Sequence, residues 1–316
     1  MRTWVIRGAF GLLVVVGLLV AGFLLRYPVQ EPIPEIHSLK DAETIARGRY
    51  LTTSVAVCVD CHSERDWSRW SGPPTAGTEG GGGDVFDHSL GFPGRIPARN
   101  ITPNGLEDWS DGEIARAITR GMDRENKALF PVMPYSYYAS LCDQDLAAIV
   151  AYLRTLPPIE NKIEPRELDF PVNLIVRTLP GKNSFGDVCA KPGTKEYGKY
   201  LTTIAGCAEC HTERSHGDAV GPLFAGGWTF QLPSGEVTSS NITPHQTTGI
   251  GRWTKEGFIS RFRNAAKQAA EPGSGKTKNT VMPWSMYAQM TDEDLGAIFD
   301  HLMSLEPVER KIVSIR

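Results

Sequence analysis

Two copies of the pentapeptide Cys-x-x-Cys-His, at residues 58–62 and 207–211, contain the groups of this chain best suited to cofactor chemistry. Two thiols three positions apart can each form a thioether with a haem vinyl group, and this spacing is typical of c-type haem attachment. The histidine that follows is close enough to bind the iron. We therefore predict two covalently bound haem c groups, held by Cys58, Cys61, Cys207 and Cys210, with His62 and His211 as iron ligands.

Zinc ribbons and thioredoxin-like proteins also use Cys-x-x-Cys pairs. The two pairs of a ribbon usually lie some 15–20 residues apart, and Cys58 and Cys207 are much farther apart. A redox dithiol would require a βαβ setting, for which the sequence gives no indication. Haem attachment is therefore favoured over both alternatives.

The sequence around the first motif returns around the second. The blocks Gly-x-Tyr-Leu-Thr-Thr, Asn-Ile-Thr-Pro, Val-Met-Pro and Asp-x-Asp-Leu occur in the same order in both copies, beginning at residues 48, 100, 132 and 143 and again at 198, 241, 281 and 292. This ordered recurrence predicts two homologous modules, each large enough to enclose one haem. A chain of 316 residues has room for two such domains and additional segments.

A haem iron bound by histidine needs a sixth ligand or keeps an open site. Met133 and Met282 are the methionines at equivalent positions of the two copies, and a methionine ligand raises the reduction potential. We predict both as axial ligands; the alternative is apolar filling beside a proline turn. The histidines outside the motifs do not pair between the copies and are expected on surfaces or loops: His37, His88, His216, His245 and His301.

Further groups are expected to orient the haem ligands. A ligating histidine usually donates its second ring N–H to a carbonyl or carboxylate, and we expect that acceptor at or near Pro73 and Pro222, which follow the motifs in register. We also expect contacts to the haem propionates from four recurring side chains, Asn100, Asn241, Trp109 and Trp253.

Helices are predicted to position these groups. Residues 42–56 and 194–205 lead into the two motifs, and Ser110 has capping-box spacing to Glu113 before a helix that matches residues 255–270. Residues 143–156 carry an apolar stripe that returns at 295–302, with Thr291 as the expected N-cap. No long alternating run predicts a sheet, so the expected fold class is all-α.

The first residues predict a membrane helix. Arg2 and Arg7 precede an uncharged apolar run of 18 residues, from Gly8 to Leu25, which is long enough to span a bilayer. An uncleaved anchor is favoured over a cleaved signal peptide, because no small-residue cleavage site precedes Arg26. The flanking arginines place the N-terminus inside, so the haem modules are expected in the periplasm, on a single-pass protein of a bacterial inner membrane.

Two cysteines remain outside the motifs. The periplasm permits disulfides, and we predict that Cys142 and Cys189 pair and tie the linker to the first module. The predicted organisation is an anchor (1–27), a tether (28–41), a first haem domain (42–156), a linker (157–193) and a second haem domain (194–316). The net charge of −3 gives no indication of nucleic-acid binding.

The recurring blocks, with Thr-Gly-Ile-Gly at residues 248–251 and Leu-Asp-Phe-Pro-Val-Asn at 168–173, resemble the cytochrome c subunits of membrane-bound alcohol, aldehyde and gluconate dehydrogenases. This resemblance implies two tandem class I cytochrome c domains after the membrane helix. It also implies a non-catalytic electron-transfer subunit. Its partners would be a dehydrogenase, and quinone, a soluble cytochrome or a terminal oxidase of the respiratory chain.

Two enzymatic alternatives remain open. A dihaem peroxidase would need one open or displaceable iron site, and a self-contained dihaem dehydrogenase, such as a thiosulfate-oxidising cytochrome, would act without a partner subunit. Equivalent methionines in both copies favour closed iron sites and electron transfer instead.

Overall fold

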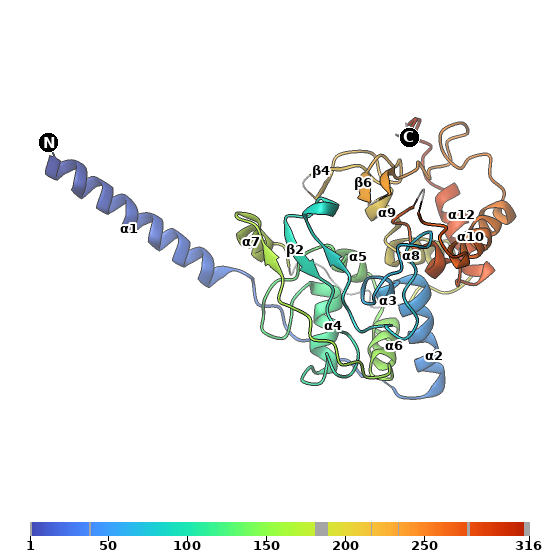
Figure 1. Ribbon diagram of the computed structural model, residues 1–316, viewed down its shortest axis with the longest axis horizontal. Helices are drawn as coiled ribbons and strands as arrows, with labels where there is room; N and C mark the ends of the chain where they lie inside the picture. The colour runs from blue at the N-terminus through green and yellow to red at the C-terminus, as the bar shows by residue number, and fades with distance from the viewer. Residues whose placement is uncertain are drawn as a thin grey trace.

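The computed structural model describes residues 2–37, 39–180, 189–215, 217–232, 234–276 and 279–312. Its first helix, α1 (Arg2–Arg26), projects from a globular body that contains the rest of the described chain (Figure 1). The body consists of an N-terminal half, residues 42–156, and a C-terminal half, residues 194–312, joined by a connecting segment. Each half contains one of the Cys-x-x-Cys-His motifs.

The elements follow the chain in a similar order in both halves. The N-terminal half contains α2 (Ala42–Tyr50), the π-helical turn η1 (Leu51–Val55), α3 (Cys58–Cys61), β1 (Val85–Phe86), η2 (His88–Leu90), β2 (Gly94–Pro97), α4 (Asp111–Arg120), α5 (Tyr135–Tyr138) and α6 (Asp143–Leu153). The connecting segment contains β3 (Glu167–Leu168), α7 (Val172–Ile175) and η3 (Val176–Thr178). The C-terminal half contains α8 (Lys195–Ile204), α9 (Cys207–Cys210), β4 (Arg214–Ser215), β5 (Asp218–Ala219), β6 (Thr229–Leu232), β7 (Gly235–Thr238), α10 (Lys255–Ala270), α11 (Trp284–Tyr287) and α12 (Asp292–Met303).

Local capping explains where the main helices begin. Ser110 and Glu113 form the expected capping box at α4, in which each side chain accepts the other residue's backbone N–H. The Thr291 side chain accepts the Asp294 N–H at the start of α12, as predicted. Cys142 occupies the corresponding position before α6 without a side-chain cap. The helices predicted around the two motifs are therefore confirmed, with shifts of a few residues at their ends.

The core lies where the helix before each motif crosses the last helix of the same half. Helix α2 packs on α6, and α8 packs on α12. Leu51, Leu146 and Ile149 are fully buried in the first half, as are Leu201 and Leu295 in the second. These contacts join the two apolar stripes into one hydrophobic cluster that spans both halves.

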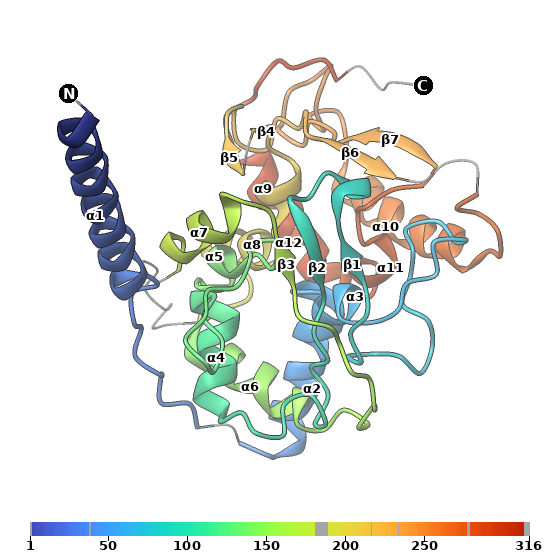
Figure 2. The same cartoon turned by 60° about the vertical axis from the view of Figure 1, so that its left-hand side comes forward.

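The predicted all-α class is wrong, because the described residues also form short antiparallel sheets. Strands β1, β2 and β3 make a three-stranded sheet, and β4–β5 and β6–β7 are two hairpins (Figure 2). Each strand has only two to four residues. Such short strands give no alternating pattern to detect, and their pairing depends on tertiary contacts.

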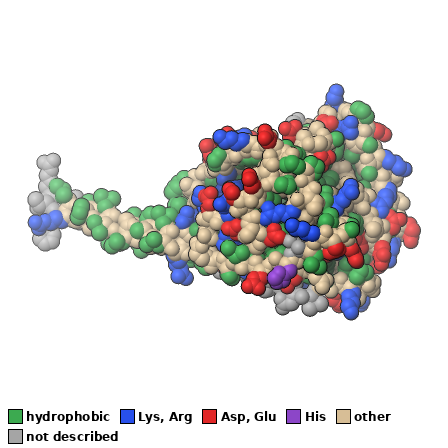
Figure 3. All heavy atoms as spheres, turned by 90° about the horizontal axis from the view of Figure 1, so that it is seen from below, with side chains coloured by type: hydrophobic (Ala, Val, Ile, Leu, Met, Phe, Trp, Pro, Cys, Tyr) green, Lys and Arg blue, Asp and Glu red, His purple; other side chains and the backbone are tan. Residues whose placement is uncertain are grey.

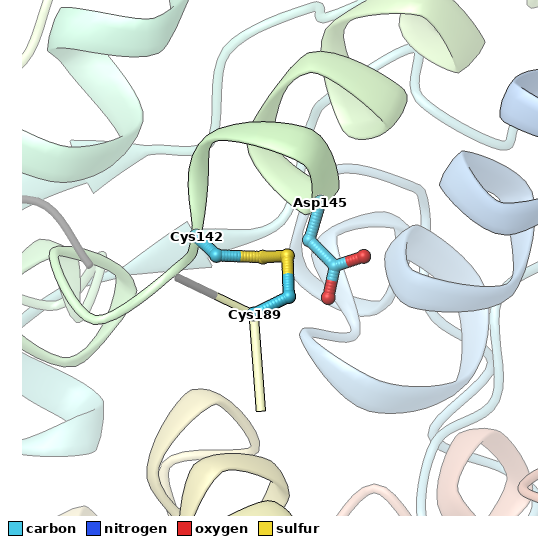
Figure 4. A group of neighbouring side chains, drawn as sticks. All are labelled: Cys142, Asp145 and Cys189. Atoms are coloured by element: carbon cyan, nitrogen blue, oxygen red, sulfur yellow. A yellow bond between two sulfur atoms is a disulfide. The ribbon is translucent and has the colours of Figure 1, made fainter. Parts of the chain in front are cut away.

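Strand pairing and a disulfide both tie the connecting segment to the N-terminal half. Strand β3 pairs with β2, with Gly94 opposite Leu168. Cys142, at the start of α6, forms a disulfide with Cys189, which confirms the predicted pairing (Figure 4). Asp145 lies beside this bond, but both sulfurs are committed to each other, so the group is not a metal site. The predicted linker, 157–193, includes residues 181–188, which lie outside the described residues, as does His216.

Helix α1 carries its apolar side chains on its outside. Hydrophobic side chains cover most of the part of this helix that is coloured by residue type in Figure 3. The window Ala9–Arg26 has a mean hydropathy of 2.4, and none of it is buried. Within the described chain this is the single helix long and apolar enough to cross a membrane; a signal sequence meets the same criteria.

Candidate functional site

Each Cys-x-x-Cys-His motif folds into one helical turn, α3 or α9, followed directly by its histidine. Residues three apart share one face of a helix, so the two thiols of each turn lie on the same side. The residue before each turn is left-handed, with φ of 46° at Val57 and 63° at Gly206. All four motif cysteines are free, whereas Cys142 and Cys189 are bonded to each other.

The two motif histidines are held in the same way. Nδ1 of His62 lies 2.7 Å from the Arg99 carbonyl oxygen, and Nδ1 of His211 lies 2.7 Å from the Ser240 carbonyl oxygen. A carbonyl only accepts, so Nδ1 carries the proton and Nε2 keeps its lone pair. The expectation that the acceptor lies at or near Pro73 and Pro222 is therefore wrong.

The Asn-Ile-Thr-Pro blocks hold these two carbonyls in place. The Asn241 side chain accepts hydrogen bonds from the Thr243 N–H and hydroxyl, at 2.9 and 2.7 Å, and donates to the Val308 carbonyl at 2.8 Å. Asn100 makes the equivalent bonds to Thr102 and to the Ile159 carbonyl. Arg99 and Ser240 directly precede these asparagines, so the recurring block marks the acceptor that sequence reasoning missed.

These same bonds correct the expected role of the two asparagines. Asn100 and Asn241 are buried, and their amide groups are occupied by backbone and threonine partners. They are therefore turn-fixing residues rather than propionate ligands. The structure gives no contact that decides the role of Trp109 or Trp253, so their expected propionate contacts stay predictions.

Burial sets the charge of the motif side chains. It lowers the pKa of His62 and of His211, although the backbone bond to Nδ1 opposes this shift, so both imidazoles are neutral at pH 7. Burial raises the pKa of Cys58, Cys207 and Cys210 to about 12, and that of Cys61 also rises. Neutral imidazole nitrogen and protonated thiols are the forms that can bind iron and add to a vinyl group.

Each motif also carries an acid that is paired with an arginine. Arg65 approaches Asp60 to 3.3 Å, and Arg214 approaches Glu209 to 2.6 Å. Each acid occupies the third position of its motif, and each arginine follows five residues later. This recurrence is a signal that the sequence reasoning did not use.

The predicted methionine ligands lie on turns that are tied to the helices leading into the motifs. Met133 and Met282 are half-buried and pack on the same hydrophobic cluster as Cys58 and Cys207. The Tyr138 hydroxyl, in the turn after Met133, donates to the Ala56 carbonyl at 2.7 Å. Tyr287 donates to the Ala205 carbonyl at 2.5 Å in the other half. Each methionine turn is thus fixed to a residue two positions before the first motif cysteine.

The donor groups around each motif fit covalently bound haem. Each half offers two free thiols on one helical turn, an imidazole with an available Nε2, and a methionine turn fixed beside the same helix. A cavity of about 620 Å³ lies elsewhere, between the end of α1 and residues of the N-terminal half and connecting segment, including Arg166 and Arg177. It contains none of the motif residues.

Comparison with known proteins agrees with these donor groups. Residues 196–306 match the family described as Cytochrome c, and such a domain implies covalently bound haem c. The chain is 29% identical over 307 residues to a protein named diheme cytochrome c-type from Cereibacter sphaeroides, covering 92% of this chain and 94% of the relative.

Dehydrogenase subunits are also similar to this chain. It is 27% identical to the fructose dehydrogenase cytochrome subunit of Gluconobacter japonicus and 27% identical to the gluconate 2-dehydrogenase cytochrome c subunit of Pantoea cypripedii. These matches cover 91% and 83% of this chain, but only 57% and 59% of the two relatives. The resemblance to cytochrome c subunits of dehydrogenases is confirmed, and with it electron transfer as the general function.

The family match corrects the predicted fold of two tandem class I cytochrome c domains, while the predicted domain boundaries stay a prediction. It covers one segment, in the C-terminal half, and residues 42–156 lie outside it. Two tandem class I cytochrome c domains are therefore not what the family comparison gives. The N-terminal half carries a β1–β2–β3 sheet that recruits a strand from the connecting segment, which distinguishes it from the C-terminal half.

Proposed function

We propose that this chain is a membrane-anchored dihaem c-type cytochrome of the periplasm, which carries electrons from a dehydrogenase, or from quinol, to a downstream acceptor or terminal oxidase. The observation that carries the proposal is the orientation of the two histidines. In both halves Nδ1 bonds to a backbone carbonyl at 2.7 Å, so the two Nε2 atoms remain for two irons. A relative with "diheme" in its name and nearly the same length supports the count of two.

The side chains have distinct roles in this proposal. Cys58 and Cys61 would bind one haem through thioethers, and Cys207 and Cys210 the other. His62 with Met133, and His211 with Met282, would ligate the irons. A bound haem c supplies one-electron redox chemistry, and a thioether ligand favours its reduced form. Both irons would then be closed, which leaves no position for a substrate.

The partners follow from the relatives and from α1. Two relatives are named as cytochrome subunits of a fructose and a gluconate dehydrogenase, which supports a dehydrogenase as the electron donor of this chain. The apolar, exposed helix α1 supports a single-pass anchor in the bacterial inner membrane. Cytochrome c domains are usually extracytoplasmic, which supports a periplasmic location for the body.

Haem counting on variants of one motif at a time tests the proposal. The membrane-extracted protein is expected to contain two covalent haems per chain, and C58A/C61A and C207A/C210A are each expected to contain one, by pyridine haemochrome assay and intact mass. The C142S/C189S variant is the matched control and should keep both haems. A single haem in the unmodified protein would contradict the count.

Spectra and co-purification test the proposed role. Two six-coordinate low-spin haems, and a dehydrogenase that purifies with the solubilised chain, are the expected results. A five-coordinate high-spin haem with peroxide turnover would identify an enzyme instead. Oxidation of thiosulfate or another donor by the purified chain alone would also contradict an electron-transfer subunit.

A further inference from the structure

A segment of the N-terminal half holds the turn that carries Met282 in the C-terminal half. This segment, Trp67–Ser71, follows the first motif, and the Met282 turn comprises Asn279–Trp284. The Ser71 hydroxyl donates to the Met282 carbonyl oxygen at 2.7 Å and accepts the Trp284 N–H at 3.0 Å. Ser71 is fully buried, so water does not compete for these bonds.

Asn279 fixes Ser71 from the other side. Its side-chain oxygen accepts the Ser71 N–H at 2.7 Å, and its side-chain nitrogen donates to the Trp67 and Arg69 carbonyls, both at 3.1 Å. The φ of 71° places Ser71 in the left-handed region, which is unfavourable for a serine. The Ser71 N–H and hydroxyl both bond to the Met282 turn, and these bonds hold the strained, buried residue in place.

Aromatic stacking extends the contact. The Trp70 and Trp284 rings stack with centroids 5.8 Å apart and planes 20° apart. The Arg261 guanidinium lies 4.6 Å from the Trp284 centroid. The Trp70 N–H also donates to the Ser274 hydroxyl at 2.9 Å. The backbone of the Met282 turn is therefore held by residues on the opposite half as well as by its own.

The equivalent contact is missing for Met133. Val220 takes the place of Ser71 in the second copy, before the same Gly-Pro pair, and it is 61% exposed. Among the bonds found in the described residues, the Met133 carbonyl accepts only the Tyr135 N–H. Within the described residues, a side chain of the other half therefore bonds to the carbonyl of Met282 but not to that of Met133.

We propose that Ser71 is a positioning residue for Met282: its hydroxyl fixes the turn that presents the Met282 thioether to the haem iron at the second motif. This assignment rests on the proposed function, in which Met282 is an iron ligand. It makes ligation at the second motif dependent on correct docking of the first half, whereas ligation at the first motif is independent of Val220.

The test uses the full-length haem-loaded protein and the variants S71A, S71G, V220A and M282A. The readouts are the far-red charge-transfer band of methionine-ligated ferric haem, the two midpoint potentials, and the affinity of added imidazole, which displaces a weakly held methionine. S71A is expected to bind imidazole about five- to tenfold more tightly at one haem, the effect of losing one buried hydrogen bond. The potential of that haem should fall, because the thioether ligand raises it.

S71G separates the hydroxyl from the backbone strain. Glycine adopts φ of 71° without cost but has no hydroxyl, so it should match S71A in imidazole affinity even if S71A folds poorly. V220A should match the unmodified protein. The double variant S71A/M282A should equal M282A in spectrum and potentials, which assigns the effect to the second motif.

Each outcome separates this inference from the proposed function. If M282A keeps the full far-red band, Met282 is not a ligand and the proposed ligand set fails. If M282A loses part of the band while S71A and S71G behave like V220A, only the role of Ser71 is overturned. The role of Ser71 would also be overturned if S71A/M282A differed from M282A in spectrum or potentials, because the S71A effect would then not act through Met282.

Discussion

At the scale of single residues, both motifs depend on a hydrogen bond from a histidine to a backbone carbonyl. The residues that provide these carbonyls, Arg99 and Ser240, differ in type, because only their main chain is used. What recurs is the asparagine that follows, since its side chain fixes the turn. The asparagine therefore recurs because it holds in place the carbonyl group of the residue before it.

The asparagine prediction belongs to this scale. N241A and N100A are each expected to lower the free energy of unfolding by about 1–3 kcal/mol, because each leaves buried threonine and backbone groups without partners. Thermal unfolding of the haem-loaded protein measures the loss. Q289A is the control, since Gln289 is exposed and should change stability little. Equal stability of N241A and Q289A would show that the turn does not depend on the asparagine.

At the scale of elements, each half is organised by a helix crossing that requires glycine. A Cβ on Gly48 would lie against the Ala148 carbonyl, and a Cβ on Gly198 against the Ala297 carbonyl, closer than atoms pack in proteins. Both glycines therefore allow two backbones to approach directly, α2 to α6 and α8 to α12. Because the motifs follow α2 and α8 closely in the chain, this crossing also sets the position of each motif.

The crossing predicts a clear difference between glycines in helices. G48A and G198A are each expected to destabilise the protein by about 1–3 kcal/mol through overpacking. G296A is the matched control in α12, where the added methyl meets only the flexible Lys255 side chain. It should be neutral or slightly stabilising, because alanine favours helix. Chemical denaturation curves compare the three, and a neutral G48A would refute the close crossing.

The capping box at α4 gives a second prediction at this scale. S110A removes the side chain that accepts the Glu113 N–H and is expected to cost about 1 kcal/mol. The control S136A changes an exposed serine in α5 and should have little effect. Equilibrium unfolding in urea distinguishes them; equal midpoints would mean that the cap contributes nothing.

At the scale of the whole molecule, the two halves exchange equivalent contacts. Tyr50 of the N-terminal half donates to Asp294 at 2.5 Å, and Tyr200 of the C-terminal half donates to Asp145 at 2.6 Å. These tyrosines, like these aspartates, occupy equivalent positions of the two sequence copies. This part of the interface is thus approximately symmetric, whereas the Ser71 contact has no equivalent at Val220.

The interface tyrosines predict loss of stability at high pH. Burial first, and the neighbouring carboxylate second, raise the pKa of Tyr50 and Tyr200; the pKa of Tyr197, beside Asp294, rises to about 12. The folded protein therefore keeps these protons while the unfolded chain releases them near pH 10. The stability that these tyrosines contribute is fully present below about pH 10 and is lost as the pH rises toward 12.

Y50F/Y200F is expected to lose less stability than the unmodified protein between neutral pH and pH 12. Both aspartates keep a partner in this variant, Arg47 at Asp145 and Tyr197 at Asp294. Urea unfolding at a series of pH values measures the slope. An unchanged slope would show that these hydroxyls do not control the alkaline loss.

The disulfide also acts at this scale, because it closes a loop between the start of α6 and the end of the connecting segment. Cys142 and Cys189 are 47 residues apart in sequence, and loss of the bond is expected to cost roughly 2–4 kcal/mol. Thermal unfolding of C142S/C189S should match that of the unmodified protein in reductant. A melting temperature that is insensitive to reductant would contradict this expectation.

The sequence by itself determined the features that depend on neighbouring residues of the chain. The motif cysteines and histidines, the capping box at Ser110 and the apolar stripes of the main helices depend on spacing along one turn or one helix. The Cys142–Cys189 pairing was predicted by elimination, since only two cysteines remained. In each case the information lies within a few residues or in a count.

Tertiary structure decided what depends on distant partners. The strands of two to four residues form because other segments lie beside them, so the sequence led to an all-α prediction that is wrong. The acceptors of His62 and His211 are backbone carbonyls, which any residue type can provide. Ser71 meets Met282 only because the two halves dock. The spacing of side chains along the sequence shows which groups share a turn or a helix. Backbone acceptors and contacts between the halves form only when the chain folds, so side-chain spacing does not predict them.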